Sequence, residues 1–179
     1  MANLQEKVSR LFPEATFEEG EILLVNIPDA KLHDLVKSLR DDCGFDYLVT
    51  IVGMDWVSSL GCVYYLTSSL SKEFVSVKVQ TTDRDNPMIH SIADLYRIAG
   101  IYEREVYDFY GIIFINNPDM RRLFLNIDWV GYPLRKDYDA NPEINPVSIE
   151  NERQTDHTDS WVDQPDGSIK HERPRVFKE

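Results

Sequence analysis

The chain has 179 residues, of which 42% are hydrophobic, and a formal net charge of −12. This length and composition suit one packed domain of ordinary size. The acidic excess argues against nucleic acid or anionic lipid as the main partner, because both are polyanions that would be repelled. No apolar run approaches the roughly 20 residues needed to span a bilayer, so we expect any membrane association to occur through partner proteins.

The first 45 residues predict a helix, a strand and a second helix. Apolar residues recur at helical spacing between Leu4 and Phe12. Residues 21–27 have the apolar content of a strand. Asp29 is the predicted N-cap of the second helix, and Gly44 is its predicted end. The buried face of this helix is predicted at Leu32, Leu35, Val36 and Leu39.

Three further strands are predicted at residues 47–54, 62–67 and 74–82. The short connections between them favour antiparallel hairpins. Helical crossovers, which a parallel sheet requires, do not separate these three strands. We therefore predict an α+β fold of two layers, with a mainly antiparallel or mixed sheet and helices on one face.

The next segment predicts two helices and a buried strand. Ser91, with Asp94 three residues later, resembles a helix start, and Gly100 is expected to break or kink that helix. A second helix is predicted at residues 102–110, ended by Gly111, and the buried strand at residues 112–115.

A short helix is predicted after that strand. Asn117 is its predicted cap and Pro118 lies in its first turn. Arg121 and Arg122 are then expected to be exposed.

Residues 103–138 mix charged and aromatic side chains. These 36 residues contain eight of the chain's twenty aromatic residues and eleven charged residues, six acidic and five basic. Such a mixture suits a surface that another protein covers.

Four motifs follow one another in this stretch. They are Glu103-Arg104-Glu105-Val106 with Asp108 and Gly111; Pro118-Asp119 with Arg121-Arg122; Asp128-Trp129; and Gly131-Tyr132-Pro133-Leu134-Arg135-Lys136-Asp137-Tyr138. In order and spacing they resemble the characteristic region of the 30 kDa subunit of respiratory complex I, also called its C subunit. The resemblance is close over residues 103–138 and extends only to the general pattern over residues 1–102.

Three positions depart from the pattern of that family. Asn117 stands where His or Lys is usual, Asn126 where Pro is usual, and Tyr132 where His is usual. These differences bear on any role that requires a basic group at position 117 or 132.

The resemblance implies a structural subunit without a redox centre in the peripheral arm of a proton-translocating NADH:quinone oxidoreductase (NDH-1). It would lie on the cytoplasmic side of the inner membrane and bind the hydrogenase-like D, the cluster-bearing B and the ferredoxin-like I subunits of complex I. Its expected task is to hold the quinone-reducing module together. The holoenzyme uses NADH, FMN, iron–sulfur clusters and quinone, whereas no cofactor, metal or catalytic residue is expected in this chain.

The residues themselves also favour a chain without a cofactor. No dinucleotide-binding or phosphate-binding glycine motif is present. Cys43 and Cys62 are too few for an iron–sulfur cluster, which typically takes four cysteines. The four histidines lack the spacing of a zinc site, and the pair His157 and Asp159 is expected to be solvated.

Two alternatives stay open at this point. Glu105 and Asp108, three residues apart on a helix, could bind a divalent ion or act as general acid and base in a stand-alone metal-dependent enzyme. Ion pairs within the helix and between subunits are the simpler interpretation of this charged run. The other alternative is the homologous subunit of a membrane-bound hydrogenase, or of a complex I-like enzyme that uses another electron donor.

We predict a subunit interface on residues 103–138. Arginine side chains suit bidentate contacts with carboxylates of a neighbouring protein or of the chain's own tail, although a solvated basic face would have the same sequence. Aromatic residues are expected as interface contacts or as core. The predicted interface residues are Glu103, Arg104, Glu105, Asp108, Asp119, Arg121, Arg122, Asp128, Trp129, Tyr132, Arg135, Lys136, Asp137 and Tyr138.

Residues 139–179 differ in composition from residues 1–138, which we predict to form the α+β domain. Nine of these 41 residues are apolar, and four prolines interrupt any helix. Such a segment buries too little apolar surface to offset its ordering entropy alone. It is either a disordered tail or, as the resemblance favours, an extended arm that docks on partner subunits through Trp161, Val162, Ile169 and Phe177.

Overall fold

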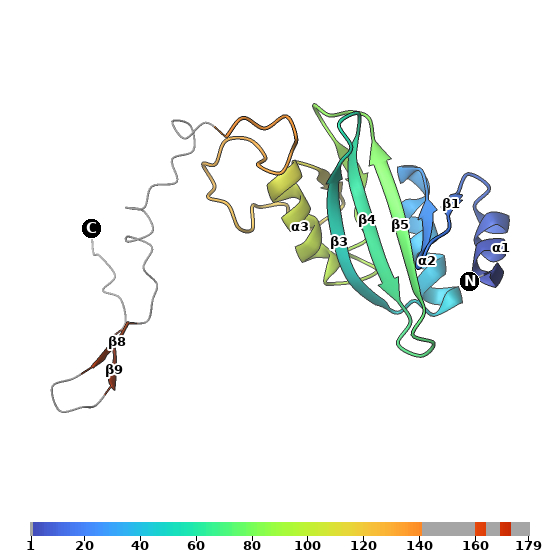
Figure 1. Ribbon diagram of the computed structural model, residues 1–179, viewed down its shortest axis with the longest axis horizontal. Helices are drawn as coiled ribbons and strands as arrows, with labels where there is room; N and C mark the ends of the chain where they lie inside the picture. The colour runs from blue at the N-terminus through green and yellow to red at the C-terminus, as the bar shows by residue number, and fades with distance from the viewer. Residues whose placement is uncertain (1, 141–159, 164–168, 173–179) are drawn as a thin grey trace. The chain divides into compact units, whose positions relative to one another are not determined.

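The structure is a computed structural model that describes residues 2–140, 160–163 and 169–172 (Figure 1). The chain forms two units, Met1–Ala140 and Asn141–Glu179. The helices of the first unit are α1 (Ala2–Leu11), α2 (Asp29–Cys43) and α3 (Ala99–Tyr110). Its strands are β1 (Thr16–Glu18), β2 (Leu23–Asn26), β3 (Tyr47–Asp55), β4 (Leu60–Thr67), β5 (Phe74–Thr81), β6 (Met88–His90) and β7 (Ile113–Ile115).

The main sheet has five strands in the order β1-β2-β5-β4-β3. Strands β3, β4 and β5 form two antiparallel hairpins, as their short connections predicted. Strand β2 pairs with β1 in the antiparallel sense and with β5 in the parallel sense, so the sheet is mixed. Strands β6 and β7 form a separate two-stranded parallel sheet.

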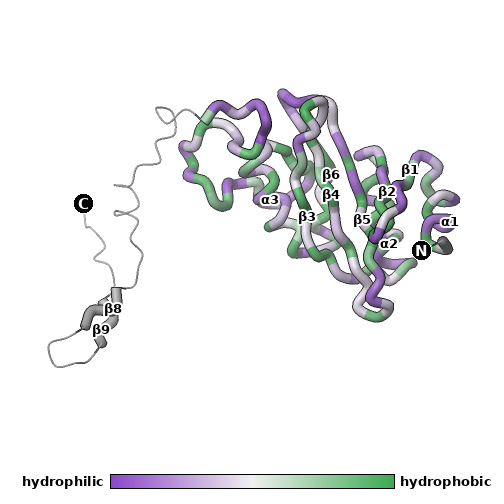
Figure 2. The backbone as a smooth tube through the Cα atoms, viewed as in Figure 1, coloured by the Kyte–Doolittle hydropathy of each residue, from purple (hydrophilic) through white to green (hydrophobic). Residues whose placement is uncertain are grey.

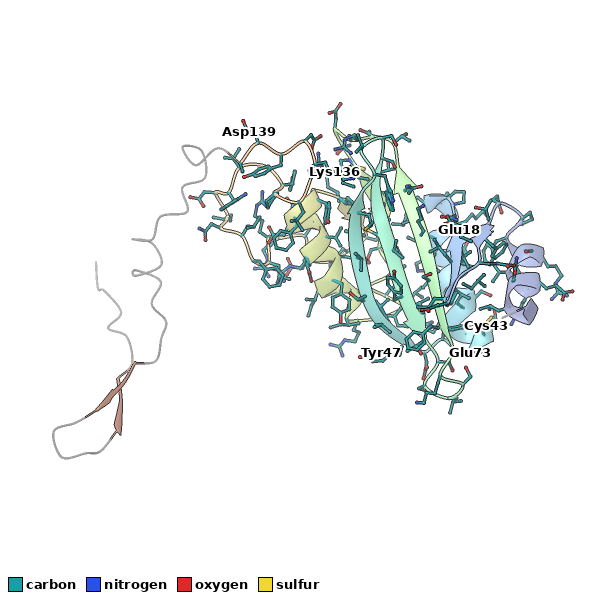
Figure 3. The ribbon with its side chains drawn as sticks, in the orientation of Figure 1. Glu18, Cys43, Tyr47, Glu73, Lys136 and Asp139 are labelled. Carbon is teal, nitrogen blue, oxygen red and sulfur yellow. The ribbon has the colours of Figure 1, made fainter. Side chains whose placement is uncertain are left out.

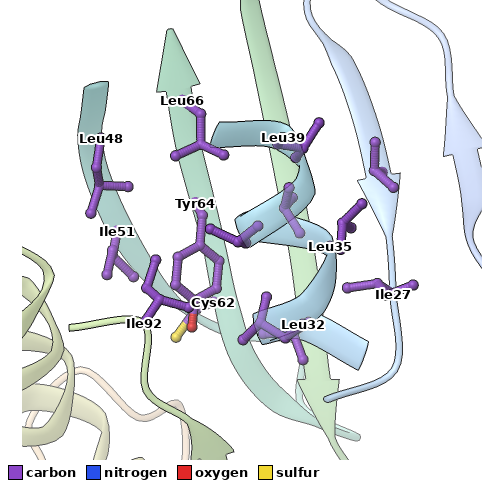
Figure 4. Close-up of a cluster of buried hydrophobic side chains, with 14 of the residues drawn as sticks. Ile27, Leu32, Leu35, Leu39, Leu48, Ile51, Cys62, Tyr64, Leu66 and Ile92 are labelled. Atoms are coloured by element: carbon purple, nitrogen blue, oxygen red, sulfur yellow. The ribbon is translucent and has the colours of Figure 1, made fainter. Parts of the chain in front are cut away.

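The core lies between this sheet and helices α2 and α3 (Figure 4). Helix α2 buries Leu32, Leu35, Val36 and Leu39, the four residues that its periodicity predicted. These side chains face the inward residues of the strands, such as Tyr64 and Leu66 of β4. The predicted two-layer α+β fold with helices on one face is therefore confirmed.

The opposite face of the sheet is only partly covered by the residues that the structure describes. Because side chains alternate along a strand, the neighbours of the core residues point away from the helices. Val52 and Met54 of β3 and Phe74 of β5 are exposed on this side.

Two expectations for helix starts are wrong. Helix α2 has Pro28 rather than Asp29 as its N-cap, and no side chain caps it. The Asp29 carboxylate instead accepts a hydrogen bond from the His90 amide at 2.7 Å and contacts His90 Nδ1 at 2.7 Å, which links α2 to β6. Residues 91–98 form turns rather than a helix.

The turns at residues 91–98 have a specific cause. The Ser91 hydroxyl and the Ile92 amide both donate to the buried carboxylate of Glu103, at 2.6 and 2.9 Å. These two hydrogen bonds attach residues 91 and 92 to α3, at the position where the predicted helix would begin. Helix α3 begins at Ala99 and includes Gly100, which neither ends nor interrupts it.

In the second unit, β8 (Ser160–Asp163) and β9 (Ile169–Glu172) pair in the antiparallel sense. Trp161, Val162 and Ile169 of the predicted arm belong to these strands. Phe177, His157 and Asp159 lie outside the described residues. The arm's docking on partners and the division at residue 138 stay predictions. In the described part of the chain, no helix has both the length and the apolar character that crossing a membrane requires.

Gly53 sets how closely α3 approaches β3. A Cβ atom at this position would lie 2.5 Å from Tyr110 Cδ2 and 3.1 Å from Val106 Cγ1, both on α3. We predict that Gly53→Ala lowers the free energy of unfolding by about 1–3 kcal/mol, the usual cost of overpacking, as measured by urea denaturation. Gly20→Ala is the control, because its Cβ would meet nothing closer than Ile22 O at 3.6 Å. Equal stability of the two variants would contradict this close packing.

Candidate functional site

The candidate site is the loop of residues 116–138, which follows β7 and packs beside α3. Helix α3 carries two acidic side chains, Glu103 and Asp108, that are both 0% exposed. Gly111 ends the helix in the left-handed conformation, with φ of 71°, as the sequence predicted. The two buried carboxylates determine where the neighbouring segments lie.

Asp108 binds the 116–138 loop through both of its carboxylate oxygens. Oδ2 accepts hydrogen bonds from three consecutive amides, those of Leu123, Phe124 and Leu125, at 3.0, 2.6 and 2.9 Å. Oδ1 accepts one from Arg122 Nη1 at 2.9 Å. Burial raises the pKa of Asp108, but these donors outweigh it and hold the pKa below its ordinary value. Asp108 is therefore a charged group inside the fold.

Arg122 connects the helix to the far end of the loop. Its Nη1 also donates to the carbonyl oxygen of Asp108 at 3.0 Å, and its Nη2 donates to the carbonyl oxygens of Trp129 and Gly131 at 3.0 and 3.1 Å. The guanidinium lies 5.3 Å from the ring centroid of Tyr132. The expectation that Arg122 is exposed is therefore wrong: its side chain is only 14% exposed.

Tyr132 packs against two arginines and the end of α3. The Arg135 guanidinium also lies near its ring, 4.8 Å from the centroid, and Tyr107 meets the ring edge-on at 6.1 Å. A Cβ on Gly111 would lie 2.4 Å from this ring. An aromatic side chain thus fits position 132, where the resemblance has His, through cation–π and ring contacts.

Arg104, Asp119 and Arg121 form an ion-paired group at the start of the loop. Arg104 donates to the carbonyl oxygens of Arg121 and Arg122, both at 2.9 Å, and lies 3.4 Å from Asp119. Arg121 pairs with Asp119 through two hydrogen bonds of 2.8 Å. The Arg121 side chain is 82% exposed, as predicted.

No short helix forms at the start of the loop, in contrast to the expectation for Asn117 and Pro118. The Asn117 side chain accepts a hydrogen bond from the Asp119 amide at 2.9 Å and donates to Glu103 Oε2 at 2.8 Å. Glu103 also receives the bonds from residues 91 and 92 described above. Burial raises its pKa, and its hydrogen-bond donors only partly oppose this effect.

The end of the loop is attached to β3 and to the segment after β5. Arg84 donates to both oxygens of Asp55 at 2.8 and 3.0 Å and to Asp137 at 2.8 Å. The Lys136 amide donates to Asp55 at 2.9 Å, and Arg135 donates to the carbonyl oxygen of Arg84 at 3.0 Å. Figure 3 shows Lys136 beside one end of β3 and Tyr47 at the other end.

Sequence reasoning missed Asp55 and Arg84. The pairing joins residues 29 positions apart, and no periodic pattern relates the two.

The remaining predicted interface residues differ in exposure. Asp128 is exposed, whereas Glu105, Tyr138 and Trp129 are half-buried. The indole nitrogen of Trp129 is buried without a hydrogen-bond partner among the described residues. The prediction that these residues contact another protein stays a prediction.

The arrangement does not support a metal site shared by Glu105 and Asp108. Both oxygens of Asp108 accept hydrogen bonds from the loop and Arg122. Within the described ranges, no three side chains of His, Cys, Asp or Glu are grouped so that they could hold a metal ion. The geometry instead builds a loop that hydrogen bonds attach to α3 and to β3, with both polar and apolar side chains exposed.

Comparison with known proteins identifies the family. Residues 25–143 match the family described as "Respiratory-chain NADH dehydrogenase, 30 Kd subunit". The chain belongs to this family. The C subunit of NADH-quinone oxidoreductase from Moorella thermoacetica is 32% identical over 146 residues, which cover 80% of this chain and 98% of that protein. The C subunit from Citrifermentans bemidjiense is 33% identical over 141 residues, covering 77% and 86%.

Other relatives join two subunits in one polypeptide. The combined C/D subunit of NADH-quinone oxidoreductase from Bacteroides thetaiotaomicron is 43% identical over 164 residues, which cover 86% of this chain. This chain spans 31% of that relative's length. Among solved structures, a chain of the membrane-bound sulfane sulfur reductase, an archaeal respiratory membrane complex, shares the fold, with a TM-score of 0.69, 24% identity and coverage of 91% of this chain and 97% of that one.

In this member of the 30 kDa subunit family, Arg122 should contribute far more to stability than Arg121. We predict that Arg122→Ala lowers the free energy of unfolding by about 3 kcal/mol, because it leaves the buried Asp108 carboxylate without its cation. Arg121→Ala, one position earlier and exposed, should cause little change. Urea denaturation of both variants measures this difference, and similar losses in the two would refute the role of Arg122.

Asp55 should make stability fall in acid. The hydrogen bonds from Arg84 are the main reason that its pKa lies well below the ordinary value of 3.8, with burial acting in the opposite direction. A carboxylate with a depressed pKa stabilises the fold above the unfolded pKa, and this contribution disappears as the pH falls through the folded pKa. Asp55→Asn should therefore be less stable than the wild type at pH 7 and lose less stability below about pH 4.

Urea denaturation at a series of pH values measures this loss. Asp34→Asn, which removes an exposed carboxylate of α2, controls for the change in net charge. Parallel curves for the wild type and Asp55→Asn would show that another group causes the acid dependence.

Proposed function

We propose that this chain is a structural subunit without a redox centre in the peripheral arm of a proton-translocating NADH:quinone oxidoreductase. The similarity to the Moorella thermoacetica C subunit, over 98% of that protein, carries this proposal. In this proposal the chain lies on the cytoplasmic side of the inner membrane and reaches the membrane through its partners.

Its task is to hold the quinone-reducing module together. The proposed partners are the D, B and I subunits of the complex. The relatives whose name joins C and D support the first of these, because one polypeptide there carries both subunits. The holoenzyme would supply the FMN, the iron–sulfur clusters, and the NADH and quinone chemistry, and this chain would supply a rigid docking surface.

The 116–138 loop suits that task. Its backbone is bound to α3 at Asp108 and to the sheet at Asp55. A surface that is already ordered before association loses less conformational entropy on binding. The predicted interface residues of this stretch then serve partly as direct contacts, such as the exposed Asp128, and partly as supports of the loop, such as Arg122.

A second candidate is the homologous subunit of a membrane-bound hydrogenase or of a complex I-like enzyme with another electron donor. The observation that favours it is the shared fold with a chain of the archaeal sulfane sulfur reductase complex. The fold thus serves in a respiratory membrane complex that is named for sulfane sulfur reduction rather than for NADH oxidation.

Isolation of the tagged chain from gently solubilised membranes tests both candidates. We expect mass spectrometry to identify the D, B and I subunits together with a flavoprotein that oxidises NADH, and membranes with the untagged chain serve as control. Recovery of those three partners without that flavoprotein would favour the second candidate. Recovery of a lone monomer from cells that express the other subunits would refute both.

A further inference from the structure

The 116–138 loop exposes large apolar side chains. The Phe124, Ile127 and Leu134 side chains are 64%, 94% and 52% exposed. Single exposed apolar residues are ordinary on a protein surface, whereas larger exposed apolar areas are typical of interaction sites. Here these three residues fall within residues 124–134. In Figure 2, apolar and polar residues alternate irregularly along the loop beside α3.

Hydrogen bonds and ring contacts fix these apolar residues in place. Phe124 stacks on Phe109 of α3 with ring centroids 5.8 Å apart, and its amide donates to Asp108. The Leu134 amide donates to the carbonyl oxygen of Phe109 at 3.1 Å. Ile127 lies within the turn in which the Trp129 amide donates to the carbonyl oxygen of Asn126 at 3.1 Å. The apolar side chains are thus presented on a backbone that is already ordered.

Many of the loop's charged side chains, in contrast, are engaged within the chain. Arg122 binds Asp108, Arg135 donates to carbonyl oxygens, and Asp137 binds Arg84. Such groups shape the loop, and their bonds would have to break before they could pair with another protein. Contacts through the exposed apolar side chains break no such bonds, and burial of these side chains is itself favourable.

We propose that the exposed apolar side chains of the 116–138 loop, Phe124, Ile127 and Leu134, dock on the D subunit. This inference rests on the proposed function and names the partner of these side chains. The combined C/D relatives support that partner, since the matched part occupies only 31% of such a polypeptide. In those relatives the covalent link holds the D part at high effective concentration beside the matched part. We therefore assign the exposed apolar side chains of this chain to contact with D.

Site-specific crosslinking tests the assignment in the assembled complex. A photoreactive phenylalanine analogue replaces Ile127 in the tagged full-length chain, and after irradiation the crosslinked peptides are identified by mass spectrometry. We expect crosslinks to the D subunit. The matched control places the same analogue at Leu70, which is 92% exposed on the β4–β5 hairpin, and should give no crosslinks to that protein.

A pair of charge substitutions provides the second measurement. Ile127→Glu should lower the recovery of the D subunit with the tagged chain by about ten-fold, since docking would bury an unpaired carboxylate. Leu70→Glu adds the same charge elsewhere and should leave the recovery unchanged. The urea midpoints of both variants should equal that of the wild type, since both side chains are exposed.

The outcomes separate this inference from the proposed function. In a complex that contains the D subunit, the inference is overturned by crosslinks from position 127 to the B or I subunits, to a second copy of this chain or to the chain's own residues 139–179. Absence of crosslinks, or undiminished recovery of the D subunit with Ile127→Glu, overturns it too. If the wild-type chain recovers no D subunit, the proposed function itself is wrong.

Discussion

The buried carboxylate of Asp108 is the group on which the 116–138 loop depends. A charge that is 0% exposed is tolerated only when ion pairing and hydrogen bonds replace its water. Here Arg122 and three consecutive loop amides provide that replacement. Without the loop, α3 would bury the Asp108 charge unpaired, and without the helix the three loop amides would lose their shared acceptor. The two segments should fold and unfold together.

Glu103 and Asp108 show two solutions to the same problem on one helix. Asp108 has an arginine partner, and its pKa is held low. Glu103 receives hydrogen bonds from Ser91, the Ile92 amide and Asn117, all of them neutral donors, and its pKa is raised. The resemblance has His or Lys at position 117. In this chain the neutral amide of Asn117 links helix and loop, because it donates to Glu103 and accepts from the Asp119 amide.

Local patterns predicted most of the fold, because periodicity reports which face of an element is buried. The face of α2, the hairpins of β3, β4 and β5, and the end of α3 at Gly111 all follow from neighbouring residues. Pairings between segments far apart in the sequence leave no such periodic pattern. The parallel pairing of β2 with β5 and the two-stranded β6–β7 sheet join segments that only the complete fold brings together. The turns at residues 91–98 likewise follow from Glu103, which lies eleven and twelve positions beyond the groups it binds.

The sequence predicted the candidate site on residues 103–138 as a charged and aromatic stretch, but it did not show which way each side chain points. Arginines and carboxylates bind one another within a chain by the same chemistry that joins two chains. Arg121 and Arg122 are adjacent and identical, yet one is exposed and the other bridges α3 to Trp129 and Gly131. The difference arises because the Asp108 carboxylate is paired with Arg122, whereas Arg121 pairs with Asp119 at the surface. Charge in this stretch thus determines the shape of the loop, and this shape in turn determines which apolar residues, foremost Ile127, remain exposed.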